Sequence, residues 1–296
     1  MSFNPTESAF EGFRLARRAP MAILAWAAAY IVFFAVFFAV AGGSLVNIIN
    51  LAQQIEQSAE PSIDELMVVF RAYGAMMILA LPLSLLFSAV LTAAVARSVI
   101  RPQDKGFGYL RLGRDELRIL GASLIVALLM FGVVMIGTTV VSALIGLAGL
   151  MSAPFLVLPA VLAGLALAAA CVWLAVRLCL VAPMTFAEQK IAIRESWAMT
   201  RGRFWPLLGM AVLAGVMSML VGLLGSIVIA PVNLIFGGLD SIAGAGTTNV
   251  VTLLVKFWPA LLVWCVVNSL LSAAQAAVIY APFSAAYLGI KGVSRA

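Results

Sequence analysis

The sequence predicts an all-α protein, a polytopic membrane helix bundle with six transmembrane helices arranged as three hairpins. Short interfacial amphipathic helices are expected on the cytoplasmic side. Two observations predict this fold: apolar stretches long enough to cross a bilayer, and loops whose charge alternates along the chain. A bilayer core needs about 20 apolar residues per helical span. Stretches of that kind lie at 20–42, 72–96, 119–150, 154–182, 204–236 and 257–289.

The composition excludes an ordinary soluble domain. Of the 296 residues, 64% are hydrophobic and only 10% are charged, and the mean hydropathy is +1.14. Soluble domains are far more polar than this. The spans use almost the whole length, so we expect a single integral membrane domain over 1–296, without room for a separate soluble catalytic domain.

The basic residues indicate the orientation. Sixteen of the 18 lie near the termini or in the segments around 97–118 and 177–203, whereas Arg71 and Lys256 lie elsewhere. Basic loops stay on the cytoplasmic side during insertion. The pattern therefore predicts an integral membrane protein with both termini in the cytoplasm. The net charge of +6 then reflects topology and attraction to anionic lipid head groups, and we expect no nucleic-acid partner.

The N-terminal region allows two interpretations. A basic flank, an apolar run and the A-x-A pattern at Ala39–Ala41 are features of a signal peptide. The apolar run from Met21 to Phe38 is longer than the roughly 7–15 residues of a signal-peptide core. We favour an uncleaved first span.

The first half of the chain contains signals for two helix starts and one loop. Asn4-Pro5-Thr6-Glu7 predicts a helix start, and an interfacial helix should follow to residue 18. Gly42-Gly43 predicts the end of the first span and an outside loop. Ser62-Ile63-Asp64-Glu65 is a capping box, so the second helix should begin near Ile63 and run to about Ile100.

The second half of the chain contains signals for a further interfacial helix and for three connections between spans. Arg111, Arg114, Asp115 and Arg118 have the spacing of one helical face, which predicts an interfacial helix before the third span. A minimal turn at 151–154 should join the third and fourth spans. The polar segment 188–203 lies inside, and the glycine-rich segment 237–246 should be a flexible outside connection.

A weak repeat divides the chain into three possible units, 1–100, 101–186 and 187–296. Each would contain a basic R-x-x-R or R-x-R segment followed by a hairpin of two spans. Chance similarity among apolar segments is the alternative.

Candidate functional residues are few. There is no histidine, and the cysteines at 171, 179 and 265 lie in apolar spans, where they act as small hydrophobes. No HExxH, GxSxG or phosphate-loop motif occurs. We therefore expect no catalytic residue, no cofactor and no metal site.

Charged and polar residues near the membrane are the remaining candidates. Arg177 lies late in the fourth span, where a charge is costly and usually has a partner. It either contacts a lipid phosphate or other anion, or extends to the interface. The candidate lipid or anion contacts are Arg97, Arg177, Arg201 and Arg203.

The sixth span carries a polar stripe of Asn268, Ser272 and Gln275. It either lines a pathway or makes hydrogen bonds between helices. Small-residue ridges at Ala160-Gly164-Ala168 and Ser218-Gly222-Ser226 predict that the fourth and fifth spans are central packing helices.

One segment resembles a known family. The stretch 177–183 reads RLCLVAP, and 195–209 reads ESWAMTRGRFWPLLG. Together they resemble the core motif of the YciC-like family of bacterial inner-membrane proteins, which is similar to the membrane domain fused to some glycerophosphodiester phosphodiesterases. The resemblance implies a six-helix membrane domain. The phosphodiesterase domain has no counterpart in this chain, so its activity does not carry over.

These observations favour a non-enzymatic, multi-pass inner-membrane protein with a structural, envelope-associated or lipid-contacting role. Its expected partners are membrane lipids, with anionic head groups at the cytoplasmic face; no protein partner can be named from the sequence. The alternative is a small transporter or channel with a polar path along the sixth span. An enzyme acting on lipid is a more distant third.

Overall fold

The structure, a computed structural model, describes residues 4–57, 62–104, 106–150, 155, 157–236 and 250–292. Within these residues it is helical and has no strand. The described chain contains six helices that are long and apolar enough to cross a membrane, as predicted. They are α3 (Pro20–Gln57), α4 (Ile63–Ile100), α5 (Arg114–Leu150), α6 (Val157–Leu178), α9 (Phe204–Phe236) and α11 (Val250–Lys291).

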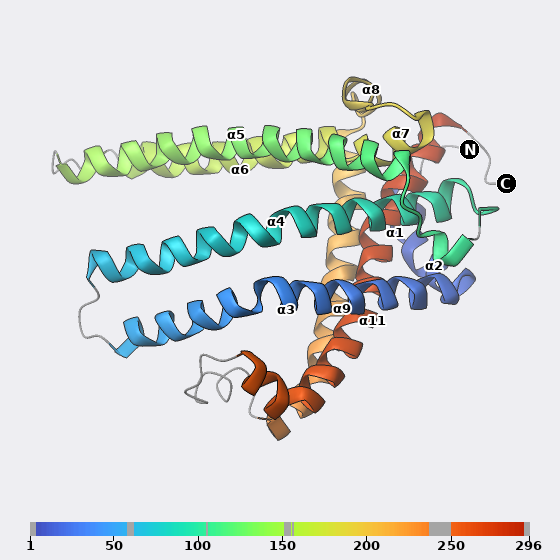
Figure 1. Ribbon diagram of the computed structural model, residues 1–296. Helices are drawn as coiled ribbons and strands as arrows, with labels where there is room; N and C mark the ends of the chain where they lie inside the picture. Colours follow the sequence, from blue (N-terminus) through green and yellow to red (C-terminus); the bar gives the residue numbers. More distant parts are fainter. Residues whose placement is uncertain are drawn as a thin grey trace.

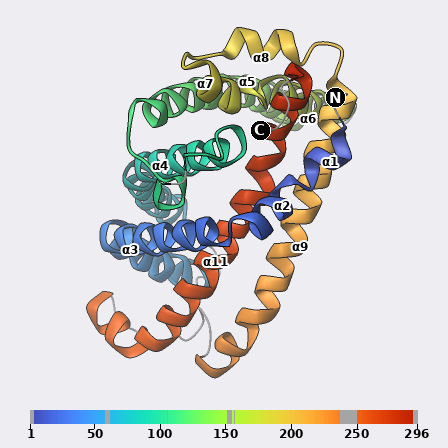
Figure 2. The ribbon, with the colours of Figure 1, turned by 90° about the vertical axis from the view of Figure 1, so that its right-hand side faces the viewer.

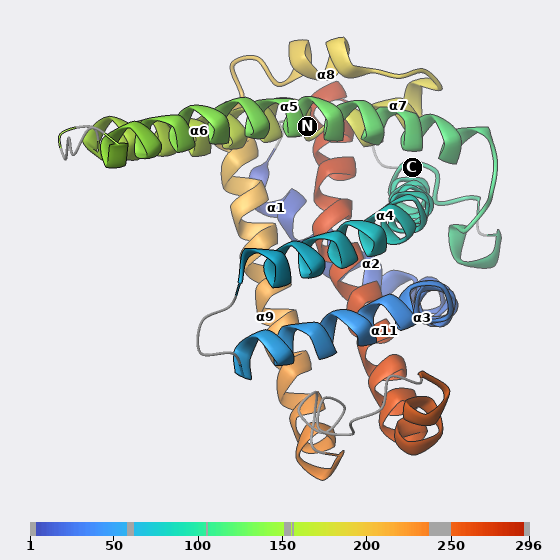
Figure 3. The ribbon, with the colours of Figure 1, turned by 60° about the vertical axis from the view of Figure 1, so that its left-hand side comes forward.

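Consecutive long helices pack as hairpins, α3 with α4, α5 with α6, and α9 with α11. The hairpins converge at one end of the molecule and diverge from it. In Figure 1 the first two extend to the left, whereas α9–α11 runs across them and extends downward; Figure 3 shows the same separation. Both termini and the short helices gather at the convergent end, seen face-on in Figure 2. We call this end the hub, and the diverging parts the arms.

The buried core lies mainly in the hub and consists largely of small side chains. One cluster joins α3, α4 and α11 through residues such as Trp26, Ala94 and Ala277. Alanines let helices approach closely, and this is how membrane helices gain packing energy. The arms instead carry large exposed apolar residues along their length, including Leu128, Leu165, Leu220, Leu224 and Leu262.

The total surface reflects this open shape. The chain has 16816 Å² of accessible surface, whereas about 12,000 Å² is typical of a compact soluble monomer of its mass. Surface of this apolar kind needs lipid as its solvent.

The sixth span is the central helix of the hub. α11 packs against α9, α3, α4 and the short N-terminal helices. The expectation that the fourth span is central is wrong, because α6 packs mainly on α5; the fifth span, α9, does pack extensively, on α11 and α1. On α6, Gly164 faces open space, so its ridge makes no close approach there. On α9, Gly222 does face α11, as the second ridge predicted, and Gly225, which is not part of that ridge, faces α11 as well.

The second helix begins at Ile63 and ends at Ile100, as the capping box predicted. The expected end of the first helix at Gly42-Gly43 is wrong. α3 continues to Gln57, because a helix tolerates glycine at a cost of about 1 kcal/mol each. At about 1.5 Å per residue, helices of this length project beyond a 30 Å apolar core.

Short elements complete the hub: α1 (Pro5–Ala9), α2 (Glu11–Arg18), the 3₁₀ turn η1 (Gly106–Tyr109), α7 (Val181–Glu188) and α8 (Ile193–Met199). Asn4 caps α1 through Thr6 N at 3.1 Å, as predicted. The expected N-terminal helix breaks at Phe10, and its second half packs on α11.

The prediction that Arg111 belongs to an interfacial helix is also wrong. α5 begins only at Arg114, so Arg111 lies before the helix. The turn at 151–154 and the connection at 237–246 lie outside the described residues. The three-unit repeat stays a prediction.

Docking of the N-terminal helices depends on Gly12. A Cβ at this position would lie 2.5 Å from the Val278 Cα, which is backbone and cannot move aside. We expect Gly12→Ala to lower the free energy of unfolding in detergent by about 1–3 kcal/mol, the usual cost of overpacking.

Gly43→Ala is the matched control, because nothing lies within 4 Å of its Cβ position. It should be neutral or stabilising, since alanine favours helix by about 1 kcal/mol. Equal stability of the two variants would contradict the close packing of α2 on α11.

Candidate functional site

Arg97 is a buried cation that ties together several elements of the hub. It lies in the last turn of α4 and is only 4% exposed. Its Nη1 donates to the Tyr109 carbonyl at 2.5 Å, and its Nη2 donates to Glu116 Oε1 at 2.6 Å. Its guanidinium also lies 5.4 Å from the centroid of the Phe186 ring. A buried charge is tolerated only when it is paired in this way.

The turn that reaches Arg97 is held from its other side by Trp26. The Trp26 indole Nε1 donates to the Gly108 carbonyl at 2.7 Å. Gly108 has φ of +65°, and a Cβ there would lie 2.4 Å from Ala25 Cβ, so only glycine fits. The connection between α4 and α5 is therefore fixed by both helices α3 and α4.

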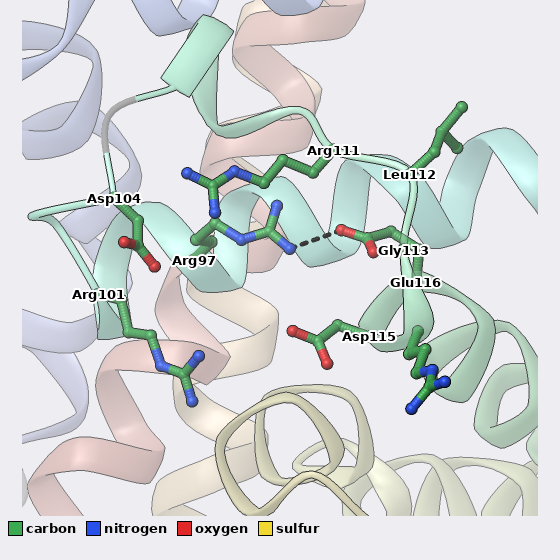
Figure 4. A pocket seen from close by; sticks show the side chains of 9 residues that line it. Arg97, Arg101, Asp104, Arg111, Leu112, Gly113, Asp115 and Glu116 are labelled. Carbon is green, nitrogen blue, oxygen red and sulfur yellow. Dashed lines mark hydrogen bonds and ion pairs between the residues drawn. The ribbon is translucent and has the colours of Figure 1, made fainter.

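An open surface cavity of about 220 Å³ lies beside Arg97. Figure 4 shows Arg111 on one side of Arg97 and Arg101 with Asp115 on the other. The sequence analysis did not predict the cavity, although the four arginines and three acidic residues over 97–116 were a signal for a charged cluster. Its lining residues are Arg97, Arg101, Asp104, Arg111, Leu112, Gly113, Arg114, Asp115 and Glu116.

Arg177 lies in a second cluster, formed with α8. The guanidinium lies 5.5 Å from the ring centroid of Trp173 and 5.7 Å from that of Trp197. Its backbone carbonyl accepts hydrogen bonds from Ser196 Oγ at 3.0 Å and Thr200 Oγ1 at 3.4 Å. These hydroxyls satisfy a carbonyl in the last turn of α6, which has no partner within its own helix.

The segments 177–183 and 195–209 are therefore joined in one physical cluster, in which Ser196 and Thr200 bind the end of α6. Two guanidinium atoms of Arg177, Nε and Nη1, are buried without a hydrogen-bond partner among the described residues. An anion contact at Arg177 stays a prediction.

The other predicted contacts differ in exposure. Arg201 and Arg203 are exposed in the turn before α9, and Arg203 Nη1 donates to the Met199 carbonyl at 3.2 Å. Arg97 is buried, so only its cavity-facing edge is available to an anion. In the same basic region, the hydrogen bond from Lys190 to Glu195 raises the pKa of the lysine and lowers that of the carboxyl.

The polar stripe on the sixth span lies half-buried along α11. Gln275 Nε2 donates to the Ser218 carbonyl of α9 at 3.3 Å and lies against Gly222. Asn268 and Ser272 lie on the same helix, two turns and one turn before Gln275 respectively. None of the three lines the cavity beside Arg97.

Comparisons with known proteins gave no match: no family model, no curated protein and no solved structure is significantly similar to this chain. The resemblance to the YciC-like family stays a prediction that rests on 177–209. Among the described residues, no group of histidine, cysteine, aspartate and glutamate could hold a metal ion.

The pairing of Arg97 with Glu116 can be tested by removing one partner or both. We expect Arg97→Leu or Glu116→Leu to lower the free energy of unfolding in mixed micelles by about 3–5 kcal/mol, because each leaves a buried charge unpaired. The double variant should be closer to wild type than either single variant.

Arg71→Leu is the control, since Arg71 is an exposed arginine on the same helix; it should change little. Additive losses in the double variant would show that the two side chains do not act as a pair.

The Arg177 cluster gives a separate expectation. Arg177→Leu and Trp197→Leu should each lower stability by about 0.5–2 kcal/mol, the range of a cation–π contact. Combined, they should cost less than the sum, because they remove the same contact. Trp205→Leu removes a 77% exposed tryptophan nearby and should have little effect. If Arg177→Leu matches wild type in thermal unfolding, the arginine merely extends to the interface.

Proposed function

We propose that the protein is a non-enzymatic, multi-pass protein of a bacterial inner membrane that contacts anionic lipid at the cytoplasmic face. Its role is structural or envelope-associated. The observation that carries this proposal is the segregation of charge: basic segments gather at the hub, while the arms carry apolar side chains outward.

Exposed side chains of the hub support contact with a membrane interface. Arg17, Arg201 and Arg203 are exposed, and Trp205 lies beside the last of them with 77% of its surface accessible. Tryptophan is enriched where membrane meets water, and each nearby basic residue adds about 1 kcal/mol of attraction to an anionic leaflet.

A transporter or channel is the second candidate, because a polar stripe runs along the sixth span. Gln275 disfavours it, since its amide is used in a hydrogen bond to α9. Such a bond holds two helices together and is worth about 0.6 kcal/mol on average. Loss of solute flux in a Gln275→Leu variant of normal stability would favour transport.

The orientation can be tested by cysteine labelling in a background with the three native cysteines replaced. Gln103→Cys, in the basic connection of the hub, should be protected from an impermeant thiol reagent in intact cells. Ser62→Cys, before α4, should react from outside. The reverse pattern, or reaction at both positions, would contradict the proposed topology.

Lipid contact can be tested in nanodiscs that contain phosphatidylglycerol and phosphatidylcholine. We expect phosphatidylglycerol to be enriched around the wild-type protein at low salt. The triple variant Arg17→Gln/Arg201→Gln/Arg203→Gln should reduce that enrichment, and raised salt should do the same, because exposed charges are screened within about 10 Å at 0.1 M. Replacing exposed Gln103 by Asn is a neutral control. Equal lipid composition around wild type and triple variant would overturn the proposal.

A further inference from the structure

The cavity beside Arg97 has an excess of positive charge. Arg97 is neutralised by Glu116 at 2.6 Å, and Asp115 pairs at 3.2 Å with Arg118, which lies outside the lining. The lining then retains three guanidinium groups, those of Arg101, Arg111 and Arg114, against the single carboxylate of Asp104. Three positive charges against one negative leave two unmatched, which favours an anion.

Two of these exposed arginines contact the surrounding elements. Arg101 lies 5.2 Å from the centroid of the Phe186 ring, on which Arg97 also packs. Arg111 lies over Gly106, where an added Cβ would be 3.3 Å from its Nη2. The planar guanidinium group is suited to phosphate oxygens, because arginine can donate two parallel hydrogen bonds to them.

A second observation indicates what else the ligand must supply. The second carboxylate oxygen of Glu116, Oε2, is buried and has no hydrogen-bond partner among the described residues. Glu116 is only 3% exposed and lines this cavity. A buried carboxylate oxygen needs a donor. A phosphate ester that also carries a hydroxyl or ammonium group would provide both the anion and the donor.

The surroundings favour a lipid over a soluble phosphate. Leu112 lines the cavity and is 83% exposed, and Phe107 and Leu117 on either side of it in the chain are 80% and 63% exposed. Large apolar side chains exposed beside arginines are costly in water. Such side chains are stable at the boundary between lipid head groups and acyl chains.

We propose that this cavity is a binding site for the phosphodiester head group of one anionic lipid, with Arg101, Arg111 and Arg114 supplying the positive charge that attracts the phosphate. The inference rests on the proposed lipid-contacting function and makes it specific. It replaces diffuse attraction to a charged leaflet by a single saturable site.

Native mass spectrometry of the full chain in detergent, titrated with phosphatidylglycerol, tests this site. Wild type should retain one phosphatidylglycerol molecule in preference to phosphatidylcholine with the same acyl chains. Arg111→Gln/Arg114→Gln should bind it at least about ten-fold more weakly, because two of the guanidinium charges that line the cavity are lost. Both side chains are exposed, so the fold should survive; unchanged thermal unfolding checks this.

Two further variants separate the site from general charge. Arg111→Lys/Arg114→Lys keeps the charge without the planar fork and should bind with intermediate affinity. Arg17→Gln/Arg201→Gln removes two exposed arginines elsewhere in the hub and should leave the one-lipid state intact.

Several outcomes would overturn the inference. Equal loss in both glutamine variants would favour diffuse attraction alone, which leaves the proposed function standing. Wild-type binding in Arg111→Gln/Arg114→Gln would exclude the site, as would displacement of the lipid by millimolar inorganic phosphate, which would assign the cavity to a soluble anion. Absence of any preference for phosphatidylglycerol, here and in nanodiscs, would overturn both proposals.

Discussion

The buried guanidinium of Arg97 is the constraint on which the hub depends. One charge at the end of α4 can be tolerated there only if the connection to α5 returns to supply the Tyr109 carbonyl and the Glu116 carboxylate. Phe186 of α7 closes the remaining side. The conformation of the whole connection follows from this requirement, and with it the positions of the other arginines around the cavity.

Hub and arms are held by different forces. Membrane helices gain little from burying apolar surface against each other, because lipid is equally apolar. The hub is held instead by paired charges, hydroxyl groups on helix ends and close alanine contacts such as that of Ala277 in α11. The described parts of the arms have fewer buried residues, among them the cluster of Ala41, Ile48 and Met76 between α3 and α4, and the hairpins diverge (Figure 1). The strongest association is thus at the end where charged groups lie, which is also where lipid head groups would be met.

The sequence was sufficient for what depends on local pattern. The six spans and the start of α4 at Ile63 follow from hydropathy and a capping box. The prediction that the first helix ends at Gly42-Gly43 was wrong, because glycine weakens a helix without ending it. The partner of Arg97 could not be predicted, since Glu116 is brought to it by a turn in which Gly108 has φ of +65°. The contact of Arg177 with Trp173 could be predicted, because Trp173 lies one helical turn earlier in the same helix. The contact with Trp197 could not, because Trp197 lies in α8 and is brought to Arg177 by the tertiary fold.

The docking of α2 on α11 has a consequence for the order of assembly. Leu15 belongs to the same buried cluster as Ala277 and Ala281, more than 250 positions later in the chain. That cluster cannot close until the last span has been synthesised and inserted. The early hairpins therefore reach the bilayer with their hub ends incomplete, and the N-terminal helices must remain free until the final step. Contacts of such long sequence separation form late and slowly.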